Sequence, residues 1–74
     1  MPKLKVVSGA ELCRLLEMHG FANVRQRGSH RVMQKKTESG TVTVPVPIHA
    51  EIRIGTLLSI IRQSGVARTF FESE

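Results

Sequence analysis

The stretch from Val24 to Lys36 constrains the fold most, because a Gly-Ser turn separates two segments that both suit β-strands. It carries five positive charges, one histidine and three clearly apolar residues. Sparse apolar residues on either side of a short turn are typical of two paired strands whose charged side chains remain in water. We therefore predict strands over residues 22–27 and 30–36, joined at Gly28-Ser29.

A helix is predicted before these strands. Ser8 and Glu11 have the spacing of a capping box, in which each residue satisfies a backbone N–H of the other. Leucines then recur at helical spacing, with the single cysteine among them, and Gly20 suits the left-handed position that ends a helix. Cys13 is therefore expected to be a small core or boundary residue, and His19 a structural residue of the last turn.

The second half of the chain predicts one more strand and one more helix. Thr41 to Val46 is predicted to be an edge strand. Thr41-Val42-Thr43-Val44 alternates at period two, so its valines should face the core, and Pro45 and Pro47 should end the strand. A helix follows over residues 54–64, with Gly65 after it and a buried stripe of Leu57, Leu58, Ile60 and Ile61. Residues 66–74 are expected to add a short helical turn that packs Phe70 against the sheet.

These elements give an α+β fold of order α-β-β-β-α, with a three-stranded antiparallel sheet and both helices on one face. Thr41, Thr43 and several basic residues would then line the opposite face. At 74 residues, the chain from 1 to 74 is expected to form a single domain.

Charge and composition indicate the kind of partner. The net charge of +5 favours a polyanionic or acidic partner. Three Phe residues without Trp or Tyr argue against a platform that stacks a row of bases. A lone cysteine suits a reducing compartment. No apolar run approaches the roughly 20 residues needed to span a bilayer, and the N-terminal segment lacks the apolar region of a signal peptide. We therefore expect a cytoplasmic protein with no membrane association.

Several kinds of chemistry find no matching pattern. The histidines and Cys13 match no zinc spacing, and the acidic residues do not cluster near them, so no metal site is expected. The Gly28-Ser29 pair lacks the surrounding pattern of a phosphate-binding loop, and no small-molecule cofactor is expected. A Ser29–His30 nucleophile pair is also disfavoured, because adjacent strand residues point to opposite faces.

Metal-independent cleavage of RNA fits the residues best. A histidine can remove the proton from a ribose 2′-hydroxyl or protonate the leaving oxygen, and His30 lies among the charges. His49 is a possible second group, although a structural or partner-contacting role is also open to it. The residues expected to hold the RNA backbone are Arg25, Arg27, Gly28, Ser29, Arg31, Lys35 and Lys36.

The order of these motifs resembles the HicA (YcfA-like) toxins of prokaryotic toxin–antitoxin pairs. The matching features are Ser8-Gly9 before a helix that ends at Gly20-Phe21, then Arg27-Gly28-Ser29-His30, then Val44-Pro45 with His49. The segment from Gly55 to Gly65 continues the match. The resemblance implies a double-stranded-RNA-binding-domain-like fold, an endoribonuclease that cleaves mRNA, and His30 as its catalytic histidine, presented by Gly28 and Ser29. It also implies a HicB-like antitoxin that binds the toxin and covers this histidine.

The charge pattern by itself leaves three other interpretations open. The same stretch could be a solvated hairpin, a non-catalytic double-stranded-RNA-binding module, or a surface that docks an acidic protein. A binding module would bind RNA in a salt-sensitive way without cutting it. A surface for an acidic protein would lose its partner in high salt.

Overall fold

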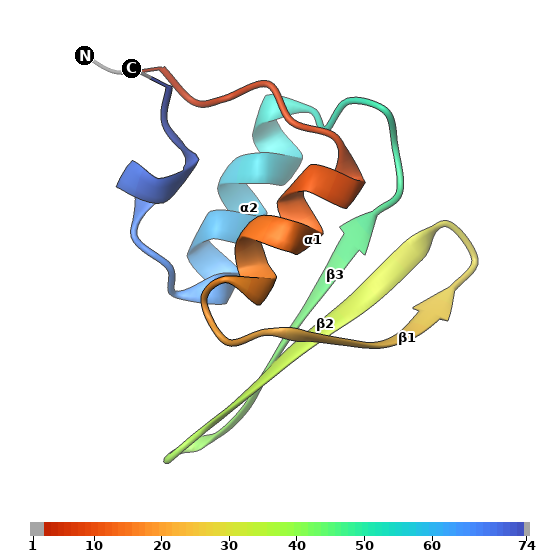
Figure 1. Ribbon diagram of the computed structural model, residues 1–74, viewed down its shortest axis with the longest axis vertical. Coiled ribbons are helices and arrows are strands. Elements are labelled where there is room, and N and C mark those ends of the chain that lie inside the picture. The colour runs from red at the N-terminus through yellow and green to blue at the C-terminus, as the bar shows by residue number, and fades with distance from the viewer. Residues whose placement is uncertain (1–2, 74) are drawn as a thin grey trace.

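The computed structural model describes residues 3–73, and its sheet consists of three antiparallel strands in the order β1-β2-β3 (Figure 1). Met1, Pro2 and Glu74, which were included in the predictions above, lie outside the described residues. The elements are α1 (Gly9–Glu17), β1 (Ala22–Arg27), β2 (His30–Thr37), β3 (Gly40–Pro47), α2 (Ile54–Ser64) and the short 3-10 helix η1 (Arg68–Phe71). This order confirms the predicted α+β, double-stranded-RNA-binding-domain-like fold.

Both ends of α1 are fixed by local hydrogen bonds. At its start, the Glu11 N–H donates to Ser8 Oγ at 3.0 Å and the Ser8 N–H donates to Glu11 Oε1 at 2.9 Å, which is the predicted capping box. At its end, the Phe21 N–H donates to the Leu16 carbonyl and the Gly20 N–H to the Glu17 carbonyl. Gly20 has a φ of +93°, which confirms the predicted left-handed glycine, and this pair of bonds is a Schellman motif.

The core lies between one face of the sheet and the two helices, which Figure 1 shows on the same side. Met33 of β2 and Val44 of β3 are fully buried there and pair with each other. From α2, Leu57 and Ile60 are buried, but Leu58 is 40% exposed, so its predicted place in the buried stripe is wrong. The core side chains are Val7, Leu12, Cys13, Leu16, Phe21, Met33, Val44, Val46, Ile52, Leu57, Ile60 and Phe71.

The third strand is longer than predicted. It runs through Pro45, which pairs with Val32, and continues to Pro47. Proline is tolerated here because β3 is an edge strand and has a partner on one side only. The predicted end of the strand at Pro45 is therefore wrong, whereas the inward orientation of the valines is confirmed by the burial of Val44 and Val46.

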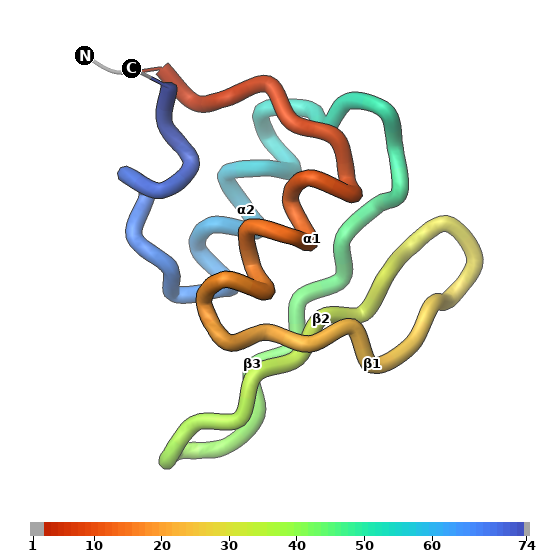
Figure 2. Tube along the Cα trace, in the orientation of Figure 1, coloured from red at the N-terminus to blue at the C-terminus, as the bar shows by residue number. Residues whose placement is uncertain are grey.

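The two ends of the described chain lie side by side (Figure 2). The Lys5 N–H donates to the Phe71 carbonyl at 2.8 Å, and Leu4 forms a β-bridge with Glu72. This contact fixes η1, and it buries Phe71 instead of Phe70, which is 52% exposed. The prediction that Phe70 packs against the sheet is therefore wrong: its ring instead meets the edge of the His19 imidazole, with 4.4 Å between centroids.

Candidate nucleic-acid interface

The turn between β1 and β2 holds the candidate histidine in a defined place. Gly28, the first residue of the turn, has a φ of +56°. Only glycines have a positive φ among residues 3–73, so Ser29, the second residue of the turn, has a negative φ. This is the pattern of a two-residue type II′ hairpin, which favours glycine at the first position. The turn is anchored because the Ser29 carbonyl accepts the Ile48 N–H at 2.7 Å. His30, the first residue of β2, is exposed on the surface.

Ser29 lies closer to His30 than the sequence predicted. Because Ser29 belongs to the turn and not to a strand, strand alternation does not separate the two side chains, and the reason given above against the pair is wrong. The Ser29 Oγ lies 3.5 Å from His30 Nδ1. This distance is at the long end for a hydrogen bond. The contact does not involve Nε2, the other ring nitrogen of His30.

A β-bulge determines which arginines share a face with this histidine. Asn23 pairs with the buried Met33, but Arg25 pairs with Val32, so β1 contains one extra residue between them. An extra residue changes the side of the sheet on which all later residues of that strand lie. Arg25 and Arg27 therefore lie on the face of His30, opposite the helices.

We call this surface the open face. Paired residues lie on the same face of the sheet. Met33 and Val44 point to the helices, and the open face is the opposite one. Its polar members are Arg25, Arg27, His30, Gln34, Lys36, Thr41 and Thr43. The Gln34 Nε2 donates to Thr43 Oγ1 at 3.3 Å, which confirms that these two side chains are on the same side.

Two of the predicted RNA-binding residues lie on the helix-covered side of the sheet instead. Arg31 is half-buried, and its Nε is buried without a hydrogen-bond partner among residues 3–73. Burial raises the pKa of the Cys13 thiol on α1, and the nearby Arg31 guanidinium acts in the opposite direction. Lys35 is also half-buried, with its Nζ 5.9 Å from the centre of the Phe21 ring. Both cations are thus partly engaged with the helical layer.

His49 is exposed at the same end of the sheet as His30. Its carbonyl accepts the Gly9 N–H at 2.9 Å, and Pro47, two residues earlier, pairs with His30. A Cβ atom on Gly9 would collide with the Pro47 carbonyl oxygen, so only glycine lets α1 approach this segment so closely. His19 is different, because its Nδ1 lies 3.0 Å from the Leu15 carbonyl and its ring packs on Phe70.

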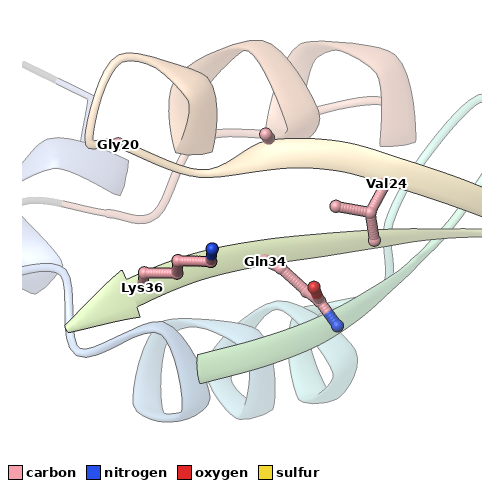
Figure 3. Close-up of a pocket in the computed structure, with 5 residues that line it drawn as sticks. Gly20, Val24, Gln34 and Lys36 are labelled. Atoms are coloured by element: carbon pink, nitrogen blue, oxygen red, sulfur yellow. The ribbon is translucent and has the colours of Figure 1, made fainter. Parts of the chain in front are cut away.

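A hollow of about 370 Å³ opens at the far end of the open face from His30 (Figure 3). Its lining residues come from the loop before β1, from β1 and from β2, and they are Gly20, Ala22, Val24, Gln34 and Lys36. Sequence reasoning missed this feature, because it assigned neither Ala22 nor Val24 to a face of the sheet. The available signal was the spacing of Gln34 and Lys36, which are two residues apart on β2 and therefore share a face of the sheet.

Residues 3–73 contain no group of three or more His, Cys, Asp or Glu side chains placed to hold a metal ion. None of the helices described over the same range combines the length and the apolar character needed to cross a membrane.

The fold and the site define a small α+β domain of the double-stranded-RNA-binding type, with a basic open face and an exposed histidine at its edge. The sequence model of one family, described as HicA toxin of bacterial toxin-antitoxin, matches residues 9–66. The chain therefore belongs to the HicA toxin family, and a toxin of this kind acts with a cognate antitoxin. A search of curated proteins found no match to the chain.

Proposed function

We propose that this toxin is a metal-independent endoribonuclease that cleaves mRNA, with His30 as its general acid or base. The observation that carries the proposal is the position of His30. Its side chain is exposed, and Arg27, its cross-strand partner, shares its face. Arg25 follows one position further along the same face. Guanidinium groups match phosphate oxygens, so an RNA strand held by them would pass the imidazole.

The reaction that suits this arrangement needs two proton transfers. The ribose 2′-oxygen attacks the adjacent phosphorus while a base takes its proton. The bond from phosphorus to the 5′-oxygen breaks, and an acid protonates that oxygen. His30 can perform either transfer, and arginine charge beside it would stabilise the crowded phosphate in the transition state. His49 is our candidate for the second group, because its exposed side chain belongs to the segment that pairs with the His30 turn.

The proposal also covers RNA binding and the antitoxin. Of the residues predicted to bind the backbone, Arg25, Arg27 and Lys36 lie on the open face, and Gly28 and Ser29 form the turn beside it. Arg31 and Lys35 would contribute mainly through the long-range field of the protein. We propose that the cognate antitoxin is HicB-like and covers His30, which would block access of RNA to the open face.

Controlled expression of wild-type toxin and of the His30→Ala variant tests the enzymatic proposal. We expect the wild type to arrest growth and degrade mRNA, and the variant to lose activity by about 100-fold or more, the usual worth of a general acid or base. The ring is exposed and makes one long side-chain hydrogen bond among residues 3–73, to Ser29, so the variant should keep its melting temperature. Equal toxicity of the two proteins would contradict a catalytic His30. RNA binding without cleavage by the wild type would favour the non-catalytic binding module.

A further inference from the structure

The hollow at the far end of the open face is shaped by small side chains. Gly20 contributes no side chain to the hollow. Ala22 adds one methyl group, and Val24 leaves an apolar surface that is 49% exposed. The result is an apolar floor without a side chain to fill it, bordered on β2 by the polar residues Gln34 and Lys36.

Polar groups stand at the edge of this floor. Figure 3 shows Gln34 and Lys36 side by side on β2, with Val24 on the neighbouring strand. The Gln34 Nε2 donates to Thr43 Oγ1, which fixes the amide plane. Its Oε1 and second N–H remain able to pair with the edge of a planar group. The Lys36 ammonium adds a positive charge for a phosphate.

We propose that this hollow is a subsite for one unstacked nucleobase of the bound RNA, an inference that rests on the proposed function. A base has flat apolar faces for Val24 and Ala22 and hydrogen-bonding edges for Gln34. An acidic protein segment would match Lys36, but it would leave the apolar floor uncovered. The combination of floor, amide and charge therefore favours a nucleotide over an acidic peptide.

The sheet register sets the distance between this base and the reacting bond. Gln34 follows His30 by four residues on the same strand and the same face, which is about 13 Å at the usual rise of a strand. Arg25, paired with Val32, lies between them. The hollow would therefore hold a base some nucleotides away from the cleaved phosphate, with Arg25 beside the backbone that connects them.

The test combines changes in the protein with changes in the RNA. Every protein carries His30→Ala so that the RNA stays intact, and binding of a short single-stranded RNA is measured by fluorescence anisotropy. One nucleotide at a time is made abasic. With an open hollow, we expect one position at which the missing base weakens binding about fivefold, within the usual worth of a base contact.

Ala22→Leu fills the hollow without changing charge, and Ala67→Leu is the matched control at an exposed alanine between α2 and η1. Filling the hollow should weaken the binding of intact RNA about fivefold and abolish the abasic penalty at that position. The control should keep the affinity for intact RNA and the abasic penalty unchanged. Gln34→Ala should reduce the same penalty. This variant replaces Ala22→Leu as the test if Ala22→Leu lowers the melting temperature. A penalty that persists in both hollow variants would overturn the inference.

The outcomes also separate this inference from the proposed function. RNA that binds with no position-specific abasic penalty contradicts the base subsite and leaves RNA recognition and catalysis by His30 intact. Failure of the protein with an open hollow to bind RNA at all contradicts both.

Discussion

At the scale of single residues, Gly28 determines how the histidine is presented. Its φ of +56° is cheap for glycine and costly for a residue with a Cβ atom, although the space around it is empty. The turn that follows begins β2 at His30. A change at Gly28 would therefore act through backbone strain and not through a steric clash.

We expect Gly28→Ala to lower the free energy of unfolding by about 1 kcal/mol, because alanine is disfavoured at this angle. Activity should fall as well, since His30 follows the turn directly. Gly28→Asn should restore part of the stability, because asparagine tolerates the left-handed region better than alanine. Urea denaturation of the three proteins measures the effect. Equal stability of the alanine variant and the wild type would show that the turn relaxes without cost.

The arginines show how far residue identity alone can predict a site. The sequence identified the basic stretch, but it could not divide that stretch between the two faces of the sheet. Regular alternation puts Arg25 and Arg27 on the helix-covered side, and the bulge between Asn23 and Arg25 moves them to the open face. A bulge depends on tertiary packing and leaves no clear mark in so short a strand. The glycine turn, by contrast, was readable because one residue type dominates its geometry.

At the scale of elements, α1 depends on the capping box at its start. Hydrogen bonds from the Ser8 backbone and side chain lower the pKa of the Glu11 carboxyl below its ordinary value of 4.5, and Arg14 adds a smaller attraction. A carboxyl whose pKa is lower in the folded state stabilises the fold at pH values above its unfolded pKa. This contribution is lost as the pH falls through the folded pKa.

We therefore expect the wild type to be more stable than Glu11→Gln at pH 7, with a difference that shrinks as the pH falls below about 4.5. Thermal unfolding of both proteins from pH 7 to pH 3 measures the difference. Ser8→Ala, which removes the other half of the box, should cost about 1 kcal/mol. A difference between wild type and Glu11→Gln that stays constant across this range would contradict the pKa shift.

Lys35 and Lys36 are neighbours on β2 and lie on opposite faces of the sheet, so their alanine variants compare the roles of the two faces. Lys36 lies on the open face, so Lys36→Ala should weaken RNA binding and reduce the salt slope by about 0.7, the value for one phosphate of a single strand. Lys35 lies over the Phe21 ring, so Lys35→Ala should leave the slope nearly unchanged and cost about 0.5 kcal/mol of stability. Affinity titrations at several salt concentrations compare them. Equal slopes for the two variants would show that the strand faces do not separate their roles.

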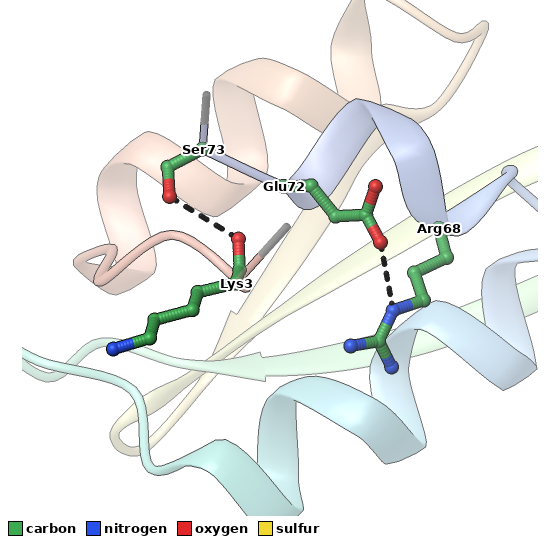
Figure 4. Close-up of polar contacts among 4 residues, drawn as sticks. All are labelled: Lys3, Arg68, Glu72 and Ser73. Carbon is green, nitrogen blue, oxygen red and sulfur yellow. Dashed lines mark hydrogen bonds and ion pairs between the residues drawn. The ribbon is translucent and has the colours of Figure 1, made fainter. Parts of the chain in front are cut away.

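At the scale of the whole molecule, charge is segregated by element. The three strands contain five arginines and lysines and no acidic residue. The acidic residues of the described chain lie in α1, in turns and near the C-terminus instead. Near that terminus, Arg68 Nε donates to Glu72 Oε2 at 3.0 Å, while Ser73 Oγ donates to the Lys3 carbonyl (Figure 4). The sheet therefore carries a positive field that attracts a polyanion.

The overall architecture was predictable from local signals, and the details that failed depend on packing between distant segments. The capping box, the Gly20 end of α1 and the β1–β2 turn each fix one boundary of an element, and together they give the element order. The choice of Phe71 over Phe70 depends on a bridge between the two ends of the chain. The hollow depends on the relative position of β1, β2 and the loop before β1.

Cleavage of a 2′-deoxy substrate is the most direct test of the proposed function. The purified toxin is given an RNA that it cuts, and the same RNA with a single 2′-deoxyribose immediately before the cleaved phosphate. We predict a 2′,3′-cyclic phosphate product from the RNA and no cleavage at the modified position, because the attacking oxygen is missing. His30→Ala should cut neither. The account would be contradicted if the deoxy substrate were cleaved as fast as the RNA. It would also be contradicted if the His30→Ala variant cleaved RNA as fast as the wild type.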